Sequence, residues 1–274
     1  MSIKADIGII LRCDKIIKKY RLKKIKVKTR RGPVDRLYCG EINGKKVAIL
    51  YGRFNGIRTP SYLIDYEQNQ LAFTQLGVKQ IIGSFIVGAI SDKPKAGDIV
   101  FPSDYVGLGN FQNNLYPEKR FKNVDMYHPF CPNLRDALMS AADKLKIVCR
   151  EGVYASFTGY PRIETQAELR FYKKNKWDVI GQTLDVEATL ARQAKCHYAP
   201  ICSLTDDLSL RELFSTDPQK ARELINKSKS EGRDKMEKII LAWLLRSSRI
   251  SSKRCACDYE YGIEKDYFSS KPAI

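Results

Sequence analysis

Histidine is the side chain that most often carries acid–base chemistry near neutral pH, and this sequence of 274 residues contains two of them. His128 and His197 lie in neither a nucleophile elbow nor an HExxH motif, so each is expected to be a packing or surface residue. The sequence also lacks a GxxxxGK[ST] loop and a GxGxxG loop after an apolar segment. Histidine-based hydrolysis and the commonest nucleoside triphosphate and dinucleotide sites are therefore disfavoured.

Eight cysteines are spread along the chain, too thinly for a disulfide-rich secreted scaffold. Cys255 and Cys257 form the tightest pair. A single CxC supplies at most two of the four ligands that structural zinc requires, so no metal site is expected. A disulfide between them would close a small, strained ring, and cross-links in a cytosolic protein would indicate a hot habitat.

The elements that must position any site follow an α/β pattern, in which short apolar segments typical of buried strands alternate with helical patterns. The expected strands are ADIGII, KKVAIL, VKQIIGSFIVGAI, GDIVF, VYASF, WDVIG and YAPICSL. The expected helices cover residues 63–75, 132–145, 164–174 and 185–194. Asp217-Pro218 opens a further stretch of one or two amphipathic helices that ends at residue 249.

The pattern predicts a central mixed sheet flanked by helices. No repeat or Pro/Gly linker divides the chain, so one domain over residues 1–250 with a tail over residues 251–274 is expected. No apolar run approaches the roughly 20 residues of a membrane-spanning helix, and the apolar stretch in the first ten residues is too short for a secretory signal. A cytoplasmic protein without a membrane partner is expected.

The chain carries 48 basic and 31 acidic residues, a formal net charge of +17. Twelve of the basic residues fall between Arg12 and Arg36, a segment that could follow a nucleic-acid backbone. Because Ile25 and Val27 alternate with lysines, the preferred interpretation is a strand with one solvated face at a sheet edge. Nucleic acid is thus a disfavoured partner.

Motifs in a fixed order along the chain resemble one family. They are ADIGII (5–10), Gly52-Arg53, DYEQN (65–69), LGV to GDIV (76–100), MYHPFC (126–131), TGYPRIETQAE (158–168), GQTLDVE (181–187) and LTD (204–206). Over residues 5–245 their order resembles the trimeric class of purine nucleoside phosphorylases, nearest to the 5′-methylthioadenosine phosphorylases. The resemblance implies a phosphorylase-like fold, a homotrimer, phosphate as co-substrate and no metal or organic cofactor. Archaeal thermophilic members carry a similar C-terminal CxC, which agrees with a disulfide there.

The resemblance also implies a reaction, in which phosphate attacks the anomeric carbon of a purine nucleoside to give free purine and (methylthio)ribose 1-phosphate. Such a site must hold phosphate and stabilise the negative charge of the departing purine. By resemblance, Arg53 and Thr183 contact phosphate, and Asp206 is the catalytic residue that engages the N7 side of the purine, by hydrogen bonding or protonation. On the residues alone, these are equally a surface arginine, a strand-end hydroxyl and a turn cap.

The substrate-binding residues implied by the resemblance are Gln182, Phe85, Ile163 and Glu164. Gln182 stands where the family has a methionine near the ribose, and Phe85 stands for a threonine beside the nucleoside. Glu164 aligns with the glutamate that reads 6-oxopurines, whereas an aspartate at position 206 is typical of 6-aminopurine enzymes. A mixed base preference is therefore expected. Like Asp206, Glu164 is also explained as a cap.

The departures from the family concern phosphate. Residues 11–15 read LRCDK where the family has a glycine-rich GG[ST]GL loop, and Cys13 stands in for a phosphate-binding hydroxyl. Phe54 replaces a histidine. The replacements at Cys13, Phe54 and Phe85 remove three polar contacts. At roughly 1.5–3 kcal/mol for each contact, their loss would weaken phosphate binding or catalysis by several powers of ten. Arg12 or Arg58 is expected to compensate.

Two hypotheses follow. The first is an active but divergent phosphorylase that acts on a purine nucleoside. The second is a catalytically degenerate homologue that serves as a binding or regulatory subunit for a nucleoside, an acidic partner or nucleic acid. Release of purine only in the presence of phosphate distinguishes the first from the second.

Overall fold

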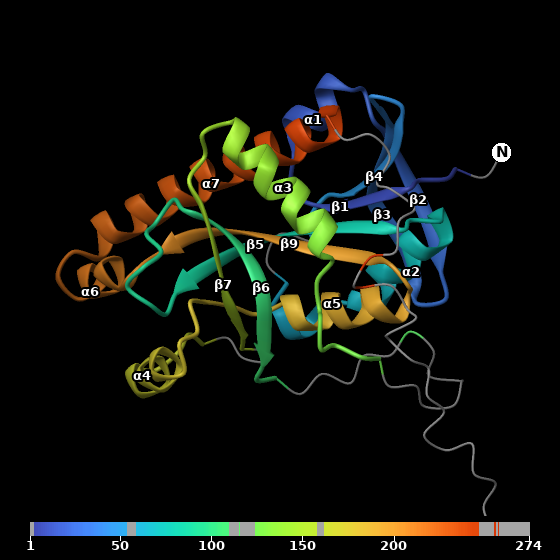
Figure 1. The fold of residues 1–274 in the computed structure, drawn as a ribbon. Helices are drawn as coiled ribbons and strands as arrows, with labels where there is room; N and C mark the ends of the chain where they lie inside the picture. The colour runs from blue at the N-terminus through green and yellow to red at the C-terminus, as the bar shows by residue number, and fades with distance from the viewer. Residues whose placement is uncertain are drawn as a thin grey trace, which may run out of the picture.

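A mixed β-sheet forms the centre of the protein (Figure 1). This computed structural model describes residues 3–53, 59–109, 115, 124–157, 162–246, 255 and 257. Within these ranges the sheet has nine strands in the order β2-β3-β4-β1-β5-β8-β7-β6-β9. They are β1 (Ile7–Ile10), β2 (Lys23–Thr29), β3 (Gly32–Ile42), β4 (Lys45–Leu50), β5 (Gln80–Ala89), β6 (Ile99–Gly107), β7 (Cys149–Ser156), β8 (Val179–Gly181) and β9 (His197–Asp206).

The strand pairing divides the sheet into an open part and a closed part. β1 runs parallel to β4 and β5, and β5 runs parallel to β9, with Ile82 opposite Ala199. β5 also pairs with β8, so that β5, β8, β7, β6 and β9 close on one another as a small barrel. The carboxyl ends of β1, β4, β5 and β9 therefore meet at one edge.

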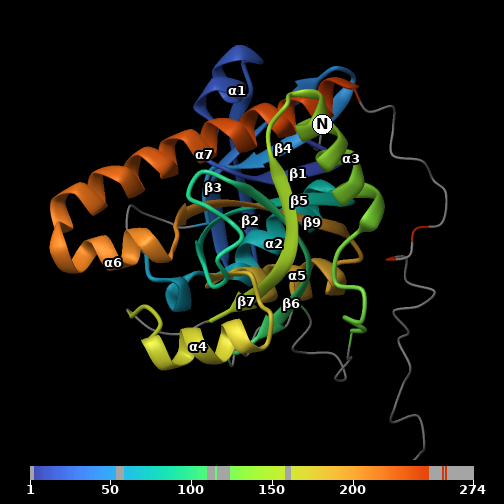
Figure 2. The same ribbon diagram turned by 60° about the vertical axis from the view of Figure 1, so that its left-hand side comes forward.

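Helices cover both faces of the sheet, as the α/β pattern predicted. They are α1 (Asp14–Lys19), α2 (Tyr66–Leu76), α3 (Pro132–Lys144), α4 (Gln166–Lys174), α5 (Leu184–Gln193), α6 (Leu208–Thr216) and α7 (Pro218–Arg246), with a 3-10 turn at Ser61–Leu63. In Figures 1 and 2, α7 crosses one side of the sheet together with α3, and α5 lies on the other side. None of the helices described is both long enough and apolar enough to cross a membrane.

Successive strand residues pack against different helices. Val47 and Ile49 of β4 belong to the apolar cluster that contains residues of α3 and α7. Ala48 and Leu50 belong to the cluster that contains residues of α2 and α5. Because both faces are buried, these strands read as continuous apolar runs in the sequence, and the seven expected strands are confirmed.

Local signals fix the helix ends. The Asp65 side chain accepts a hydrogen bond from the Gln68 backbone N–H (2.8 Å) at the start of α2, and Gly77 ends that helix with φ +83°. Thr165 and Glu168 form a capping box at the start of α4. The four expected internal helices are confirmed with ends shifted by a few residues.

The structure also differs from the expectations. The stretch after Asp217 is a single helix, α7, of 29 residues. The strand β3 and the short helix α1 were not expected, because β3 contains exposed polar residues and α1 falls in the segment compared with a glycine-rich loop. The basic segment does contain an edge strand, β2, whose lysines are mostly exposed, as predicted.

Candidate active site

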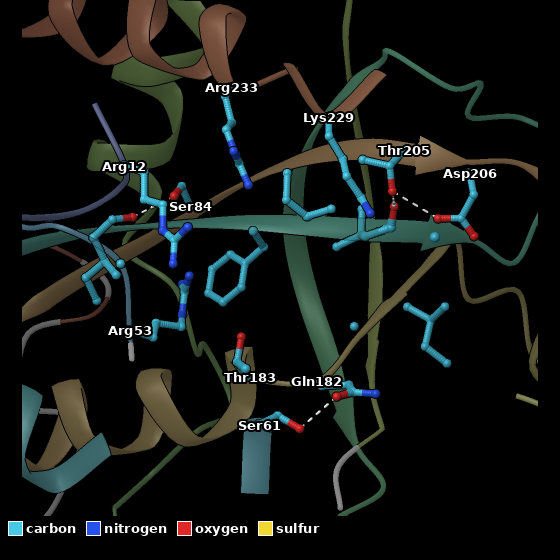
Figure 3. Close-up of a pocket in the computed structure, with 18 of the residues that line it drawn as sticks. Arg12, Arg53, Ser61, Ser84, Gln182, Thr183, Thr205, Asp206, Lys229 and Arg233 are labelled. Carbon is cyan, nitrogen blue, oxygen red and sulfur yellow. Dashed lines mark hydrogen bonds between the residues drawn. The ribbon is translucent and has the colours of Figure 1, made fainter. Parts of the chain in front are cut away.

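A cavity of about 660 Å³ opens where the parallel strands end (Figure 3). Its walls come from the ends of β1 and β4, from residues 84–88 of β5, from residues 181–183 after β8 and from the end of β9. α7 contributes Lys229, Arg233 and Met236. A crevice at the carboxyl ends of parallel strands is the usual ligand site of α/β folds, and this volume suits a small organic ligand.

Arg53 is fixed at one end of the cavity. Its guanidinium is largely buried and forms a two-point ion pair with Glu187 of α5, in which Nη2 lies 3.0 Å from Oε2. The Tyr198 hydroxyl donates to the same carboxylate (3.1 Å). Burial works to lower the pKa of Arg53, but the Glu187 carboxylate outweighs it and the pKa is raised. Arg53 therefore remains a cation.

The backbone and face of Arg53 are held as well. Its carbonyl oxygen accepts hydrogen bonds from Arg36 Nη2 and Asn69 Nδ2, each at 3.1 Å. Its guanidinium carbon lies 4.2 Å from the centre of the Phe85 ring, a cation–π contact. Phe85 thus forms a wall that supports Arg53 and leaves the cavity open.

Arg12 reaches the same end of the cavity from the end of β1 (Figure 3). It lies against Gly52, whose φ is +79° and where an added Cβ would stand 3.0 Å from Arg12 Nε. Only glycine suits both that conformation and that approach. Thr183 faces the two arginines at the start of α5, and its side chain makes no capping hydrogen bond.

Two carboxylates lie at the other end, and both are bound by Arg211 of α6. Arg211 Nη1 is 3.1 Å from Glu164 Oε2, and Arg211 Nε is 3.1 Å from Asp206 Oδ2. The Thr205 hydroxyl donates to Asp206 Oδ1 (3.0 Å). A carboxylate has about four lone-pair sites, so Asp206 keeps capacity for a ligand donor.

With a cationic end and an acidic end in one cavity, the geometry fits a family of nucleoside enzymes. The model of the phosphorylase superfamily matches residues 6–244. The chain belongs to the phosphorylase superfamily. The S-methyl-5′-thioadenosine phosphorylase of Hyperthermus butylicus is 34% identical over 265 residues, which cover 93% of this chain and 94% of that protein.

Two further relatives agree with this membership of the phosphorylase superfamily. A protein of Methanopyrus kandleri named "Probable S-methyl-5'-thioinosine phosphorylase" is 37% identical over 148 residues, 54% of this chain and 58% of the relative. The solved structure of a methylthioadenosine phosphorylase from an Antarctic soil metagenomic library superimposes with a TM-score of 0.81 at 25% identity, covering 93% of this chain and 90% of that chain. The phosphorylase-like α/β fold is thereby confirmed.

The phosphorylase fold brings nearly all of the residues predicted for the site to one cavity. The lining includes Arg12, Arg53, Phe85, Ile163, Glu164, Gln182, Thr183 and Asp206. Gln182 accepts a hydrogen bond from the Ser61 hydroxyl (2.7 Å), and Ile163 is 75% exposed at the rim. Phe54 and Arg58 lie outside the described residues.

Cys13, which was expected to contact phosphate, is not among the residues that line the cavity. It precedes α1, and its fully buried side chain packs in the apolar cluster with α3 and α7, where its thiol contacts the Leu11 carbonyl (3.6 Å). Burial raises the pKa of this thiol, so it stays protonated. The onset of α1 directs residue 13 into the core.

Sequence reasoning missed four charged residues of this phosphorylase site: Glu187, Arg211, Lys229 and Arg233. Lys229, Arg233 and Met236 follow the i, i+4, i+7 spacing of one helix face, so the pattern could have shown that they point the same way. Arg211 lies one turn after Asp207, the N-cap of α6, which brings it near Asp206. The partnership of Glu187 with Arg53 joins positions 134 residues apart and left no local signal.

Proposed function

We propose that the protein is a purine nucleoside phosphorylase that transfers the pentose of a methylthioadenosine-like nucleoside to phosphate. One observation carries the proposal: Arg12, Arg53 and Thr183 border the same cavity as Glu164 and Asp206, from opposite ends. An anion and a base with hydrogen-bond donors can therefore bind at the same time. The names of the relatives point to the same reaction.

The cationic end is the proposed phosphate site. A guanidinium donates two parallel hydrogen bonds to a phosphate, and two arginines with a hydroxyl replace contacts that a glycine-rich loop would make through backbone N–H groups. Arg53 is already oriented by Glu187, so little rotational freedom is lost on binding. Phosphate is the co-substrate, and the proposal requires no cofactor.

The chemistry is a displacement at the anomeric carbon. The glycosidic C–N bond breaks, and its electron pair goes to the purine while a phosphate oxygen bonds to the carbon. The departing purine takes up a proton at N7 from solvent, and the Asp206 carboxylate accepts a hydrogen bond from that N7–H, which stabilises the leaving base. Phe85 and Gln182 border the space between the two ends and are the proposed ribose neighbours.

The choice of base rests on Asp206 and Glu164. An acidic oxygen accepts a hydrogen bond from a 6-amino group or from a ring N–H, so both purine classes have a partner here. Since Arg211 binds both carboxylates, their availability to a base is coupled. A homotrimer remains a prediction from the resemblance, and a cytoplasmic location remains a prediction from the sequence.

The test is release of free purine by the full chain from methylthioadenosine, methylthioinosine, adenosine, inosine and guanosine, with and without phosphate. We expect release that requires phosphate and yields one pentose 1-phosphate per purine. The Asp206→Asn variant tests whether the release comes from this site, and its kcat is expected to be lower by about 10²–10³-fold. Nucleoside binding in a calorimeter without release, at any temperature up to unfolding, would instead support the degenerate homologue.

A further inference from the structure

A second group of chemically active side chains lies outside the cavity. Cys131, His197, Cys255 and Cys257 place their ligand atoms within 4.8 Å of one another. His197 begins β9 and Asp206 ends it, so the group lies roughly 30 Å from the acidic end of the cavity at about 3.3 Å per residue. It is not part of the proposed active site.

The four side chains form a closed set. Cys131 Sγ lies 3.4 Å from Cys255 Sγ, Cys255 Sγ lies 3.2 Å from Cys257 Sγ, and His197 Nδ1 lies 3.0 Å from Cys257 Sγ. The three cysteines are each at most 6% exposed. A tetrahedral zinc ion with Zn–S near 2.3 Å and Zn–N near 2.0–2.1 Å separates its ligand atoms by about 3.5–3.8 Å, so the three distances would each lengthen by roughly half an ångström when the ion binds.

We propose that Cys131, His197, Cys255 and Cys257 together bind one structural Zn²⁺ ion. Three thiolates and one imidazole are a donor set that selects zinc over magnesium or calcium, which prefer oxygen ligands. Four protein ligands fill a tetrahedral shell and leave no position for water or substrate. The site is therefore structural and not catalytic.

The surrounding backbone holds the ligands in place. The Leu134 N–H donates to Cys131 Sγ (3.4 Å) at the start of α3, and the Cys131 N–H donates to the Tyr198 carbonyl (2.8 Å). Arg192 Nη1 donates to the Cys257 carbonyl (2.8 Å).

The site corrects the conclusion drawn from cysteine spacing. Cys255 and Cys257 alone supply two ligands, but the fold adds Cys131 from 124 positions earlier and His197 from 60 positions before Cys257. His197 was expected to be a packing or surface residue. No disulfide joins the cysteines of the described residues, so the CxC disulfide that the resemblance implied is not formed here.

Zinc and a disulfide make different demands on this cluster. A disulfide needs two sulfur atoms and no histidine. The zinc site needs His197 as one of its four ligands, so replacing His197 should affect zinc binding and not a disulfide. Zinc would also join residues 255 and 257 to the start of α3 and the start of β9. The predicted tail would then be attached to the domain through the metal.

The test is the zinc content of the full chain, purified without chelators and measured by elemental mass spectrometry. We expect about one zinc per chain, and at least a fivefold loss in His197→Gln and in Cys257→Ser. Cys149→Ser is the matched control, because that half-buried cysteine lies in β7 outside the cluster, and it should keep its zinc. Equal zinc in His197→Gln and the unchanged chain would overturn the proposal.

A second measurement uses the unchanged chain, so it does not depend on whether the variants fold. The unchanged chain is stripped of metal, reduced and titrated with Co²⁺, which reports tetrahedral thiolate ligation by its ligand-field and thiolate charge-transfer bands. We expect saturation at one Co²⁺ per chain and displacement by Zn²⁺. No uptake by the reduced chain would overturn the zinc proposal, and an as-purified intact mass lower by two hydrogens with no zinc would show a disulfide in its place. Neither readout depends on phosphorolysis, so the zinc site and the proposed function fail separately.

Discussion

Arg211 is the residue on which both acidic groups of the cavity depend. Its guanidinium binds Glu164 through Nη1 and Asp206 through Nε, and its side chain is 19% exposed. Because a guanidinium is planar and rigid, the two carboxylates are held in a fixed relative position. In the proposed reaction Arg211 is therefore a positioning residue, because it acts on the base through the two carboxylates that it holds.

Replacing Arg211 is expected to change the preference between purines. Arg211→Gln should lower kcat/KM about 10–100-fold, corresponding to roughly 1.5–3 kcal/mol for lost hydrogen bonds to charged groups, and should do so unequally for adenosine and inosine. Arg211→Lys should restore part of the activity. Arg222→Gln, on an exposed part of α7, is the control. An equal loss for both nucleosides with no rescue by lysine would indicate a purely structural role.

Arg12 is expected to carry part of the phosphate affinity that the absent glycine-rich loop would supply. Arg12→Ala should raise KM for phosphate about tenfold or more while KM for the nucleoside changes little, since one charge-assisted contact is worth about 1.5–3 kcal/mol. Initial rates over a phosphate series measure this. Lys24→Ala in the edge strand removes the same charge outside the cavity. An unchanged phosphate KM in Arg12→Ala would remove Arg12 from the site.

The sequence predicted which residues lie at the ends of strands, but not which side chains they contact. Arg53 follows β4 and Asp206 ends β9, and these strands run in the same direction within the sheet, so that both residues lie at its carboxyl edge. Thr183 follows β8, which runs antiparallel to β5, so strand direction alone does not predict that it joins them. The direction in which the Cys13 side chain points depends on where α1 begins. No side chain caps that end of α1, so the sequence gives no clear signal for its first residue. The ligands of the Cys131 cluster come from distant segments and converge only in three dimensions.

Gly232 allows the helix α7 to lie unusually close to the strand β9. A Cβ on Gly232 would lie 1.7 Å from Ser203 Oγ and 2.6 Å from Ser203 Cβ of β9. The helix therefore approaches the strand more closely than any larger residue permits. This approach brings Lys229, Arg233 and Met236 to the cavity.

Gly232→Ala is expected to destabilise the protein by about 1–3 kcal/mol, because overpacking at the α7–β9 contact outweighs the gain of up to about 1 kcal/mol in helix propensity. The midpoint of urea unfolding measures this. In a Ser203→Gly background the same alanine should cost less, which a double-mutant cycle detects. A Gly232→Ala variant more stable than the parent would show that the contact relaxes freely.

The elements themselves were largely predictable, since strands buried on both faces leave continuous apolar runs. β3 was missed because its buried residues, such as Val34, Leu37 and Ile42, are separated by exposed ones and do not alternate strictly. The single helix α7 was left open as one or two, since Gly232 in its middle weakens the helical pattern. Its reason for being glycine lies in Ser203, on another element.

The excess positive charge of the whole molecule is concentrated in two regions. One is the solvated edge strand β2, and the other is the cavity, where Arg12, Arg53, Arg211, Lys229 and Arg233 face Glu164 and Asp206. Within the described residues no ion-pair partner lies within 4.0 Å of Lys229 or Arg233. An anion that enters the cavity relieves repulsion among these cations. Binding is therefore coupled to global stability.

This coupling predicts that phosphate raises the unfolding temperature of the whole chain. A ligand at 100 times its Kd stabilises the folded state by about 2.7 kcal/mol, which corresponds to an increase in Tm of about 5–10 °C for a protein of this size. Thermal unfolding is compared in phosphate and in chloride of equal ionic strength, so that screening is matched. With phosphate binding about tenfold weaker, Arg12→Ala should lose about half of the difference, and Lys24→Ala should keep it. If phosphate and chloride gave the same Tm, the cavity would not be an anion site, and the proposed reaction would lose its co-substrate.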